Sequence, residues 1–248
     1  MQKITYIDSP EIFLNTVSKK IKQTDIVLDI GCGINPQKYI KPVVHICAEP
    51  YEQYAQHLLQ KIGNKEKFFI VLKQKWDEVI KTIPKNGVDT IITLDVIEHL
   101  EKEEGLEVLK NTIPLARKQV VIFTPYGFLP QEVPEGMKDA WGLDGSEWQK
   151  HKSGWTEKDF DENWDIYICP EFHFYDAITN EKFEKPYGAM FAILNKNEYS
   201  KYNIYSFTRN IYGFLTHTLP LYFRTNNIFY NPVLKFIYRK IILKIIKK

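Results

Sequence analysis

The chain has 248 residues, of which 44% are hydrophobic, so it is long and apolar enough for one domain with a full sheet and an appendage. Its net charge of +2 hides two unlike parts, because residues 199–248 carry +9 and the preceding residues carry −7. Three cysteines without paired spacing argue against a disulfide framework or a zinc site, and the lack of an 18-residue apolar run or a signal-peptide core argues against a spanning or exported protein. A cytoplasmic protein is therefore expected.

Apolar segments alternate with helical ones along the first half of the chain. A helix is predicted from Ser9, a favoured capping residue that precedes Pro10. Buried strands are predicted at residues 26–30, 43–48, 68–72, 88–94 and 120–123. This alternation indicates an α/β fold with a doubly wound, parallel sheet, in which ligands bind at the carboxyl ends of the strands.

The first of these strands leads into a glycine turn. Asp29 precedes Gly31 and Gly33, which let backbone approach a ligand with no side chain in the way. A dinucleotide fold needs a third glycine three residues after Gly33, where this chain has Pro36. A carboxylate just before the glycines suits a ligand with an ammonium group, and a ligand without a pyrophosphate makes the third glycine unnecessary. S-adenosylmethionine has both properties.

From about residue 21 to residue 196, the chain resembles the class I S-adenosylmethionine-dependent methyltransferases. The resemblance implies a Rossmann-like, mostly parallel seven-stranded sheet whose sixth and seventh strands are antiparallel. It also implies that the cofactor's methionine part lies at the first motif, which comprises Asp29, Gly31, Cys32 and Gly33.

Three further residues are expected at the nucleoside. Glu49 matches the family's second motif, and it lies close to the offset of roughly 20 residues at which nucleotide-binding folds place an acid on the ribose hydroxyls. Trp76 and Asp77 follow the third predicted strand, where the family contacts adenine. Trp76 fits an ordinary core position equally well.

The segment that follows the fourth strand resembles the motif that the family carries beside the transferred methyl group. Asp95, Glu98 and His99 would share one face at a helix start and could ligate a divalent metal, as in some quinone and small-RNA methyltransferases. Three ligands from one turn need a fourth, however, and Leu100 stands where the RNA enzymes have a second histidine. We therefore expect no metal, with Asp95 at the cofactor and Glu98 capping the next helix.

Residues 127–163 form a long insertion that is expected to bind the acceptor, since loops of this length are usually functional or disordered. Trp141, Trp148 and Trp155 argue against disorder, and aromatic faces commonly stack on sugar rings. The segment 147–156 resembles one in methyltransferases of bacterial polysaccharide gene clusters, where a Trp-x-x-His-x-Ser-x-Trp pattern recurs. Trp148 and Trp155 are accordingly predicted to bind substrate.

His151, within that pattern, is predicted to bind substrate and to act as the catalytic base. A sugar hydroxyl has a high pKa, and an imidazole that titrates near neutrality is the usual group to take its proton. A structural histidine that holds the insertion in place is the alternative. His99 and Tyr126 are the next candidates for the base.

We expect a methyltransferase domain over residues 1–198 and a basic aromatic extension over residues 199–248. Strands at 166–169, 171–174 and 189–194 would complete the sheet. Basic residues near anionic lipid contribute about 1 kcal/mol each, so the extension is predicted to attach peripherally to the cytoplasmic face of a membrane. Packing against the domain or a second subunit is the next alternative, and nucleic-acid binding is the least favoured. The sequence does not set the oligomeric state.

The sequence thus predicts methyl transfer from S-adenosylmethionine to an oxygen acceptor, first a sugar hydroxyl of a polysaccharide or lipid-linked glycan precursor. A quinone or phenolic small molecule, with metal assistance through the acidic motif, is the alternative acceptor. A scaffold that binds partners without catalysis is the alternative from another class, and the intact cofactor motifs argue against it.

Overall fold

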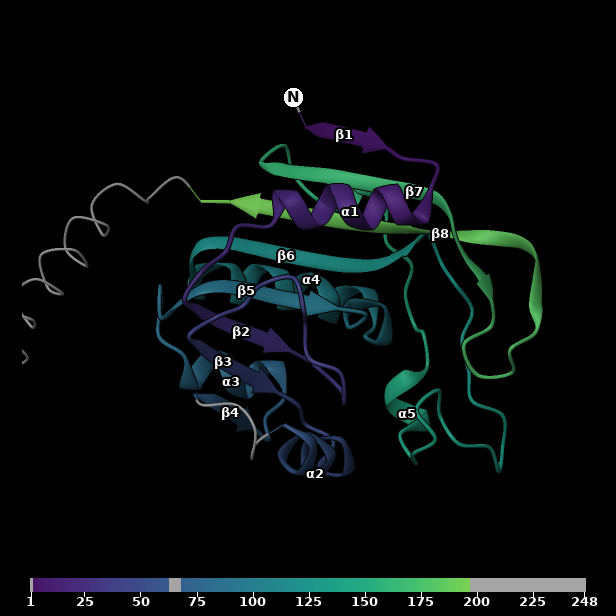
Figure 1. Cartoon of the computed structure of the whole chain (residues 1–248), viewed down its shortest axis with the longest axis horizontal. Helices are drawn as coiled ribbons and strands as arrows, with labels where there is room; N and C mark the ends of the chain where they lie inside the picture. Colours follow the sequence, from purple (N-terminus) through teal and green to yellow (C-terminus); the bar gives the residue numbers. More distant parts are fainter. Residues whose placement is uncertain (1, 63–67, 197–248) are drawn as a thin grey trace, which may run out of the picture. The chain divides into compact units, whose positions relative to one another are not determined.

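The computed structural model describes residues 2–62 and 68–196, which form one eight-stranded sheet (Figure 1). The strand order is β1-β7-β8-β6-β5-β2-β3-β4. The bounds are β1 (Lys3–Tyr6), β2 (Ile26–Ile30), β3 (Val44–Ala48), β4 (Phe69–Leu72), β5 (Val88–Leu94), β6 (Ala116–Tyr126), β7 (Trp164–Tyr175) and β8 (Lys182–Asn195). β8 runs antiparallel to both of its neighbours, and the other pairings are parallel. The chain order reverses between β2 and β5, which is where a doubly wound sheet binds ligands.

Helices cover both faces of the sheet because successive strand residues point to opposite sides. Val27 packs with Phe13 and Val17 of α1 (Pro10–Lys20) on one face. Leu28, the next residue, packs on the other face among residues of α3 (Trp76–Thr82) and α4 (Lys102–Thr112). α2 (Glu52–Lys61) places Leu58 against the first of these faces, beside β3.

The doubly wound sheet is confirmed, but it has eight strands instead of the seven expected. β1 is the additional strand, and it lies parallel to β7 at the edge of the sheet (Figure 1). Four residues are too few to show a periodic pattern, so this strand could not be predicted from the sequence. The segments 166–169 and 171–174 belong to the single strand β7, whose register to β8 shifts between Cys169 and His173.

The insertion is an ordered structure built around one carboxylate. Asp139 accepts hydrogen bonds from the backbone N–H groups of Trp141, Leu143 and Gly145, and from the hydroxyl of Tyr54 on α2. This network orders the chain ahead of the short helix α5 (Ser146–Gln149).

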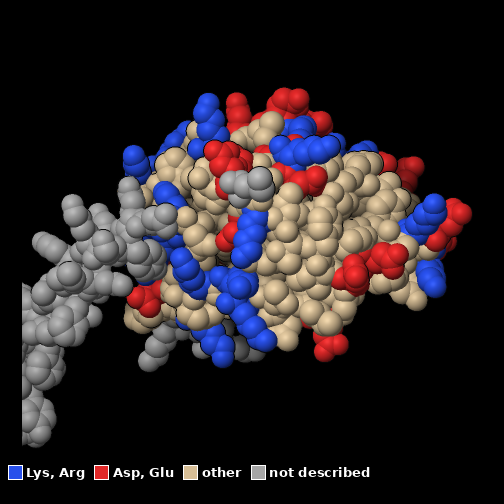
Figure 2. Space-filling model, turned by 90° about the horizontal axis from the view of Figure 1, so that it is seen from above, with Lys and Arg blue, Asp and Glu red and all other residues tan. Residues whose placement is uncertain are grey.

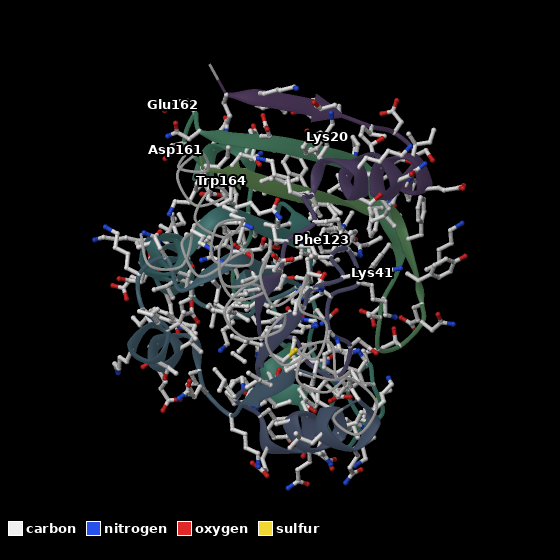
Figure 3. The ribbon with its side chains drawn as sticks, turned by 60° about the vertical axis from the view of Figure 1, so that its left-hand side comes forward. Lys20, Lys41, Phe123, Asp161, Glu162 and Trp164 are labelled. Carbon is white, nitrogen blue, oxygen red and sulfur yellow. The ribbon has the colours of Figure 1, made fainter. Side chains whose placement is uncertain are left out.

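The insertion ends in a turn that starts β7. The backbone N–H of Asn163 donates to the Asp161 carboxylate, and that of Trp164 donates to the Asp161 carbonyl. Figure 3 shows Asp161, Glu162 and Trp164 together at this end of the strand, with Phe123 deep in the sheet. The insertion is therefore anchored at both ends, by β6 and by β7.

A glycine in α4 permits close packing between this helix and the insertion. A Cβ at Gly105 would lie 2.4 Å from the ring of Trp155, which is fully buried. Alanine is favoured over glycine in a helix interior by about 1 kcal/mol, but overpacking a core costs about 1–3 kcal/mol. We expect Gly105→Ala to lower the free energy of unfolding by up to roughly 2 kcal/mol, as measured by urea denaturation.

The matched control for this change is Glu103→Ala, which alters an exposed position in the same helix. Its free energy of unfolding should change by no more than about 0.5 kcal/mol. If the urea concentration at the midpoint of unfolding is not lowered by Gly105→Ala, the Trp155 ring can move aside.

The surface on the side of β1 carries both signs of charge. Figure 2 shows a band of Lys and Arg beside a broad uncharged area, with acidic side chains scattered around both. Within residues 2–62 and 68–196, no helix is long and apolar enough to cross a bilayer. The extension 199–248 lies outside the described residues, so its membrane role stays a prediction.

Candidate cofactor and acceptor site

A cavity of about 770 Å³ lies at the carboxyl ends of the parallel strands. Its walls come from the turn after β2, from the ends of β3, β5 and β6, and from the insertion. The sequence-predicted residues that line it are Gly31, Cys32, Gly33, Glu49, Trp76, Asp95, His99, Trp148 and His151. Asp29, Asp77, Tyr126 and Trp155 are not among its lining residues. The cavity thus joins the nucleoside motifs to the acceptor insertion.

The turn after β2 requires glycine. Gly31 and Gly33 have φ angles of +66° and +55°, in the left-handed region that favours glycine. A Cβ at Gly33 would lie 2.2 Å from the ring of Trp141, so this tryptophan of the insertion packs directly on the turn. Trp141 also contacts the ring of Tyr54 at 4.8 Å. Its role as a wall of the cavity was not predicted from the sequence.

Glu49 lies buried at the end of β3 and faces the cavity. Its two carboxylate oxygens accept hydrogen bonds from the backbone N–H groups of Gly33 and Tyr51, each at 2.9 Å. Burial raises the pKa of Glu49 to about 7, although these two hydrogen bonds oppose the shift. The carboxylate therefore ties the glycine turn to β3 and is poised to change protonation near neutrality.

Asp29 has a different role from the one predicted. Its carboxylate accepts a hydrogen bond from the backbone N–H of Gln37 at 2.8 Å and lies 3.4 Å from Nε2 of His45. The side chain points to the α1 and α2 side of the sheet, away from the cavity. Asp29 therefore fixes the loop that follows the glycine turn, and the prediction that it contacts the cofactor is corrected.

The adenine end of the cavity also differs from the prediction. Trp76 lines the wall and donates from Nε1 to Glu104, but Asp77 lies in the first turn of α3 beside Lys81. Gln74, in contrast, lines the cavity, and its buried Oε1 has no hydrogen-bond partner among the described residues. An orphaned buried acceptor is costly, so a donor from a bound ligand is expected there.

Two carboxyl groups, those of Asp95 and Glu98, influence each other at the end of β5. Burial raises the pKa of Asp95 to about 6, and burial together with the Asp95 charge raises the pKa of Glu98 well above its ordinary value. Oε2 of Glu98 accepts from the hydroxyl of Thr124, and its Oε1 is buried. Oε1 has no hydrogen-bond partner among the described residues, and Glu98 therefore holds its proton more firmly than an ordinary carboxyl group. It is buried in the 3-10 helix Ile97–His99, which corrects the expectation that it caps the following helix.

His99 and His151 face each other with ring centroids 4.8 Å apart. Nδ1 of His99 lies 3.2 Å from the carbonyl of Lys150, and Nδ1 of His151 lies 2.6 Å from that of Leu129. A carbonyl only accepts, so both Nδ1 atoms carry the proton and both Nε2 atoms keep a free lone pair. Burial lowers the pKa of His151, and burial followed by the charge of His151 lowers that of His99 to about 4.

His173 on β7 is a third histidine on the cavity wall. Its Nε2 is buried and has no hydrogen-bond partner among the described residues. Burial lowers the pKa of His173 to about 4, and the neighbouring His151 acts in the same direction. The sequence placed this residue in a strand, but alternation alone could not show that it reaches the site.

The aromatic residues of the insertion divide between the cavity and the core. Trp148 lines the cavity, is partly exposed and packs near Tyr51 with ring centroids 6.0 Å apart. Trp155 is fully buried, and its Nε1 donates to Ser153. The predicted substrate contact of Trp155 is therefore wrong, because the ring fills the core instead.

Tyr126 is also displaced from its predicted role. Its hydroxyl donates to Glu157 at 2.8 Å, and burial together with this bond raises its pKa above the ordinary value. A phenol that holds its proton this firmly and lies outside the cavity wall is a poor base. The structure removes it from the set of catalytic candidates.

No protein-family profile and no curated protein sequence matches the chain. Several solved structures are similar to it. A SAM dependent methyltransferase from Archaeoglobus fulgidus is 16% identical with a TM-score of 0.46, covering 76% of this chain and 95% of its own. A putative S-adenosylmethionine dependent methyltransferase from Listeria monocytogenes is 11% identical with a TM-score of 0.47, covering 75% and 100%. Magnesium protoporphyrin IX methyltransferase from Synechocystis PCC 6803, with bound SAM, is 13% identical with a TM-score of 0.43, covering 75% and 77%.

The sheet itself decides the fold. Without the edge strand β1, it has seven strands, and the last strand is inserted antiparallel between β6 and β7. The chain has the class I methyltransferase fold. In this fold, the residues present suit S-adenosylmethionine: Gly31 and Gly33 line the cavity without side chains of their own, Glu49 offers a carboxylate, and Gln74 offers an orphaned acceptor.

Proposed function

We propose that the chain transfers a methyl group from S-adenosylmethionine to a hydroxyl oxygen, and that the acceptor is a sugar of a polysaccharide or lipid-linked glycan precursor. The position of His151 is the observation that carries the proposal. This residue of the insertion places a neutral imidazole in the same cavity as the glycine turn.

Three residues are assigned to the cofactor. Glu49 would accept hydrogen bonds from the ribose hydroxyls, and Oε1 of Gln74 would accept one from the adenine amino group. The backbone at Gly31 would lie along the methionine part. When bound, S-adenosylmethionine supplies a methyl group on a positively charged sulfur, which is already a good electrophile. The chain's own residues therefore need to align the acceptor oxygen and remove its proton.

His151 can remove that proton. Its Nδ1–H is held by the carbonyl of Leu129, so Nε2 is the free base and its orientation is fixed. Nε2 takes the proton of the acceptor hydroxyl, and the imidazolium that results keeps its bond to Leu129. Because burial lowers the pKa of His151 below its ordinary value of 6.5, the ring is neutral and ready to accept a proton at pH 7.

The wall beside His151 suits a sugar. Trp148 presents a partly exposed aromatic face, and Gln131 and Lys152 add polar groups around it. Sugar rings combine apolar C–H faces with many hydroxyls, so they need both kinds of contact at once. This mixture supports a sugar acceptor over a flat phenol, which would need an apolar slot.

The proposal is tested first by calorimetric titration of the full chain with S-adenosylhomocysteine, and then by methyl transfer to a panel of oligosaccharides, lipid-linked sugars and catechols. Micromolar binding followed by methylation of a sugar is the expected result. Absence of binding would favour the scaffold, and methylation of catechols alone would favour the small-molecule acceptor.

One observation favours a metal-assisted reaction as the second candidate. Ligand atoms of Glu98, His99 and His151 lie within 4.8 Å of one another. His151 comes from the insertion and offers the ligand outside the acidic motif that could not be identified from the sequence. A divalent cation held there would lower the pKa of a bound hydroxyl in place of a histidine base.

A chelator separates the two candidates. With His151 as the base, added Mn²⁺ should not raise the rate of methyl transfer after dialysis against EDTA. If dialysis lowers the rate of methyl transfer, Mn²⁺ restores it, and the Glu98→Gln variant shows no such restoration, the metal-assisted reaction is established instead.

A further inference from the structure

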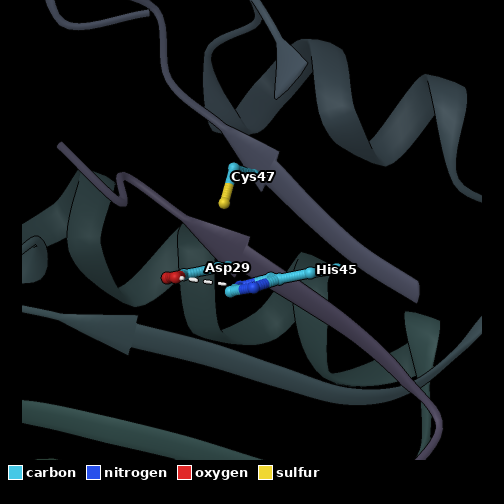
Figure 4. Close-up of side chains that lie close together, drawn as sticks. All are labelled: Asp29, His45 and Cys47. Carbon is cyan, nitrogen blue, oxygen red and sulfur yellow. Dashed lines mark hydrogen bonds and ion pairs between the residues drawn. The ribbon is translucent and has the colours of Figure 1, made fainter. Parts of the chain in front are cut away.

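A second group of buried polar side chains lies beneath the glycine turn, on the opposite side of the sheet from Glu98. Asp29, His45 and Cys47 are all buried, and one ligand atom of each lies within 4.8 Å of those of the other two. Figure 4 shows the Cys47 sulfur directed toward the Asp29–His45 pair. The group serves neither the acceptor nor the proposed base.

The sheet register brings these three side chains together. Asp29 on β2 stands directly opposite Cys47 on β3, and His45 precedes Cys47 by two residues on the same face. Neighbouring strands lie roughly 4.8 Å apart, so side chains paired in this way can bind a common atom. The framework that holds the donors is the central part of the sheet, which is rigid.

Cys32 adds a fourth donor from the glycine turn. Its sulfur lies 3.8 Å from the Gly33 carbonyl, and its side chain packs with Cys47 and with Leu58 of α2 in one buried cluster. All three cysteines of the chain are free. The donor set is therefore two sulfurs, one imidazole nitrogen and one carboxylate oxygen.

This donor set has the composition of a tetrahedral zinc site, and the Asp29, His45 and Cys47 atoms have a spacing that suits one. Zinc binds sulfur at about 2.3 Å and nitrogen or oxygen at about 2.0–2.2 Å, which places neighbouring ligand atoms of a tetrahedron roughly 3.3–3.8 Å apart. Nε2 of His45 lies 3.4 Å from Oδ2 of Asp29, which is long for a hydrogen bond but within that range. The amide of Gln37 binds Asp29 from outside, as the partners of metal-ligating carboxylates do.

We propose that Asp29, Cys32, His45 and Cys47 bind one Zn²⁺ ion, which fastens the glycine turn to β2 and β3. Binding releases the thiol protons and the proton between His45 and Asp29, and the ion takes their places. The ion would be structural, because four protein ligands leave no open position for substrate. It would hold Cys32, and with it the cofactor-binding turn, in the conformation that the cavity requires.

A metal-free arrangement makes a different prediction. Asp29 and His45 would then form a buried pair that needs neither sulfur, and the two cysteines would only pack against Leu58. Replacing a sulfur would leave that pair intact. The contribution of the thiolates to cation binding therefore decides between the two arrangements.

The test uses cobalt as a spectroscopic substitute for zinc in the full chain, after reduction and chelator treatment. One equivalent of Co²⁺ should produce a near-ultraviolet thiolate-to-metal band and the intense visible bands of a tetrahedral centre, and Zn²⁺ should abolish both. Glu98, His99 and His151 contain no sulfur and cannot give the thiolate band. The experiment needs no cofactor or acceptor, so its result is independent of the proposed function.

Cys47→Ser and His45→Gln should weaken cobalt binding by on the order of 100-fold or more, because losing a ligand costs at least as much as losing its outer partner. Cys32→Ser should reduce the thiolate band. Cys169→Ser is the matched control, since Cys169 is a buried thiol on β7, and it should leave the spectrum unchanged. If a variant fails to fold, the spectrum of the unchanged protein still decides. A spectrum without a thiolate band, or a band that Cys47→Ser leaves intact, would overturn the proposal.

Discussion

Replacing His151 with alanine should lower the turnover number for methyl transfer by on the order of 10²-fold or more, while the affinity for S-adenosylhomocysteine stays the same. The change removes the only nitrogen that the insertion directs into the cavity with its lone pair free, and leaves Glu49 and the glycine turn in place. The measurement is turnover at saturating cofactor, together with calorimetry on the same preparation.

The pH dependence of turnover tests whether His151 acts as the base. The base must be neutral to accept a proton, and the pKa of His151 lies below 6.5 in the free protein. Turnover should therefore be flat above pH 7 and fall as pH decreases through that pKa. His57→Ala on α2 is the matched control, because His57 is not a lining residue of the cavity. Equal turnover for His151→Ala and His57→Ala would make His151 a structural residue that holds the insertion.

The fold was accessible from the sequence because its determinants are local and repeated. Alternating buried strands and helices specify a doubly wound sheet wherever the periodicity is long enough to detect. β1 has only four residues, and its place is set by pairing with β7, where each partner residue lies 162 positions later in the sequence. A strand of that kind is determined by tertiary contact and leaves no periodic signal.

The site was less accessible because a motif fixes where a residue lies but not which way its side chain points. Asp29 stands two residues before Gly31, yet its strand position turns it to the far face of the sheet. Trp155 matches a family pattern, yet α4 has a glycine opposite its ring, and the ring is buried there. Gln74 was missed for the complementary reason, since a lone glutamine at a strand end has no distinctive spacing.

The cation site illustrates the same limit. Spacing rules search for cysteines close together in sequence, and Cys32 and Cys47 are separated by a loop and a strand. A His-x-Cys pair on one strand was the available signal, because residues two apart share a face. Only the register of β2 against β3 adds the carboxylate.

Glu49 provides the second large expected effect. Glu49→Ala should weaken S-adenosylhomocysteine binding by roughly 10²-fold or more, because a hydrogen bond to a charged group contributes about 1.5–3 kcal/mol and a ribose offers two. Glu52→Ala is the matched control, since Glu52 is an exposed acid on α2 that pairs with Lys73. Calorimetry at pH 8 measures both variants, and equal affinities would remove Glu49 from the cofactor site.

The protonation of Glu49 gives this assignment a test that does not depend on the size of the loss. Ribose hydroxyls donate, so they favour the ionised carboxylate, whereas burial holds the pKa of the free protein at about 7. Affinity should therefore rise with pH up to about 7, by at most tenfold per unit, and level off above it.

The stability of the fold should change with pH in the opposite direction. Because the pKa of Glu49 lies above its ordinary value of 4.5, the free energy of unfolding should fall as pH rises from 4.5 to about 7. Glu49→Gln should flatten both slopes, and a pH-dependent affinity that persists in this variant would assign the titration to another group.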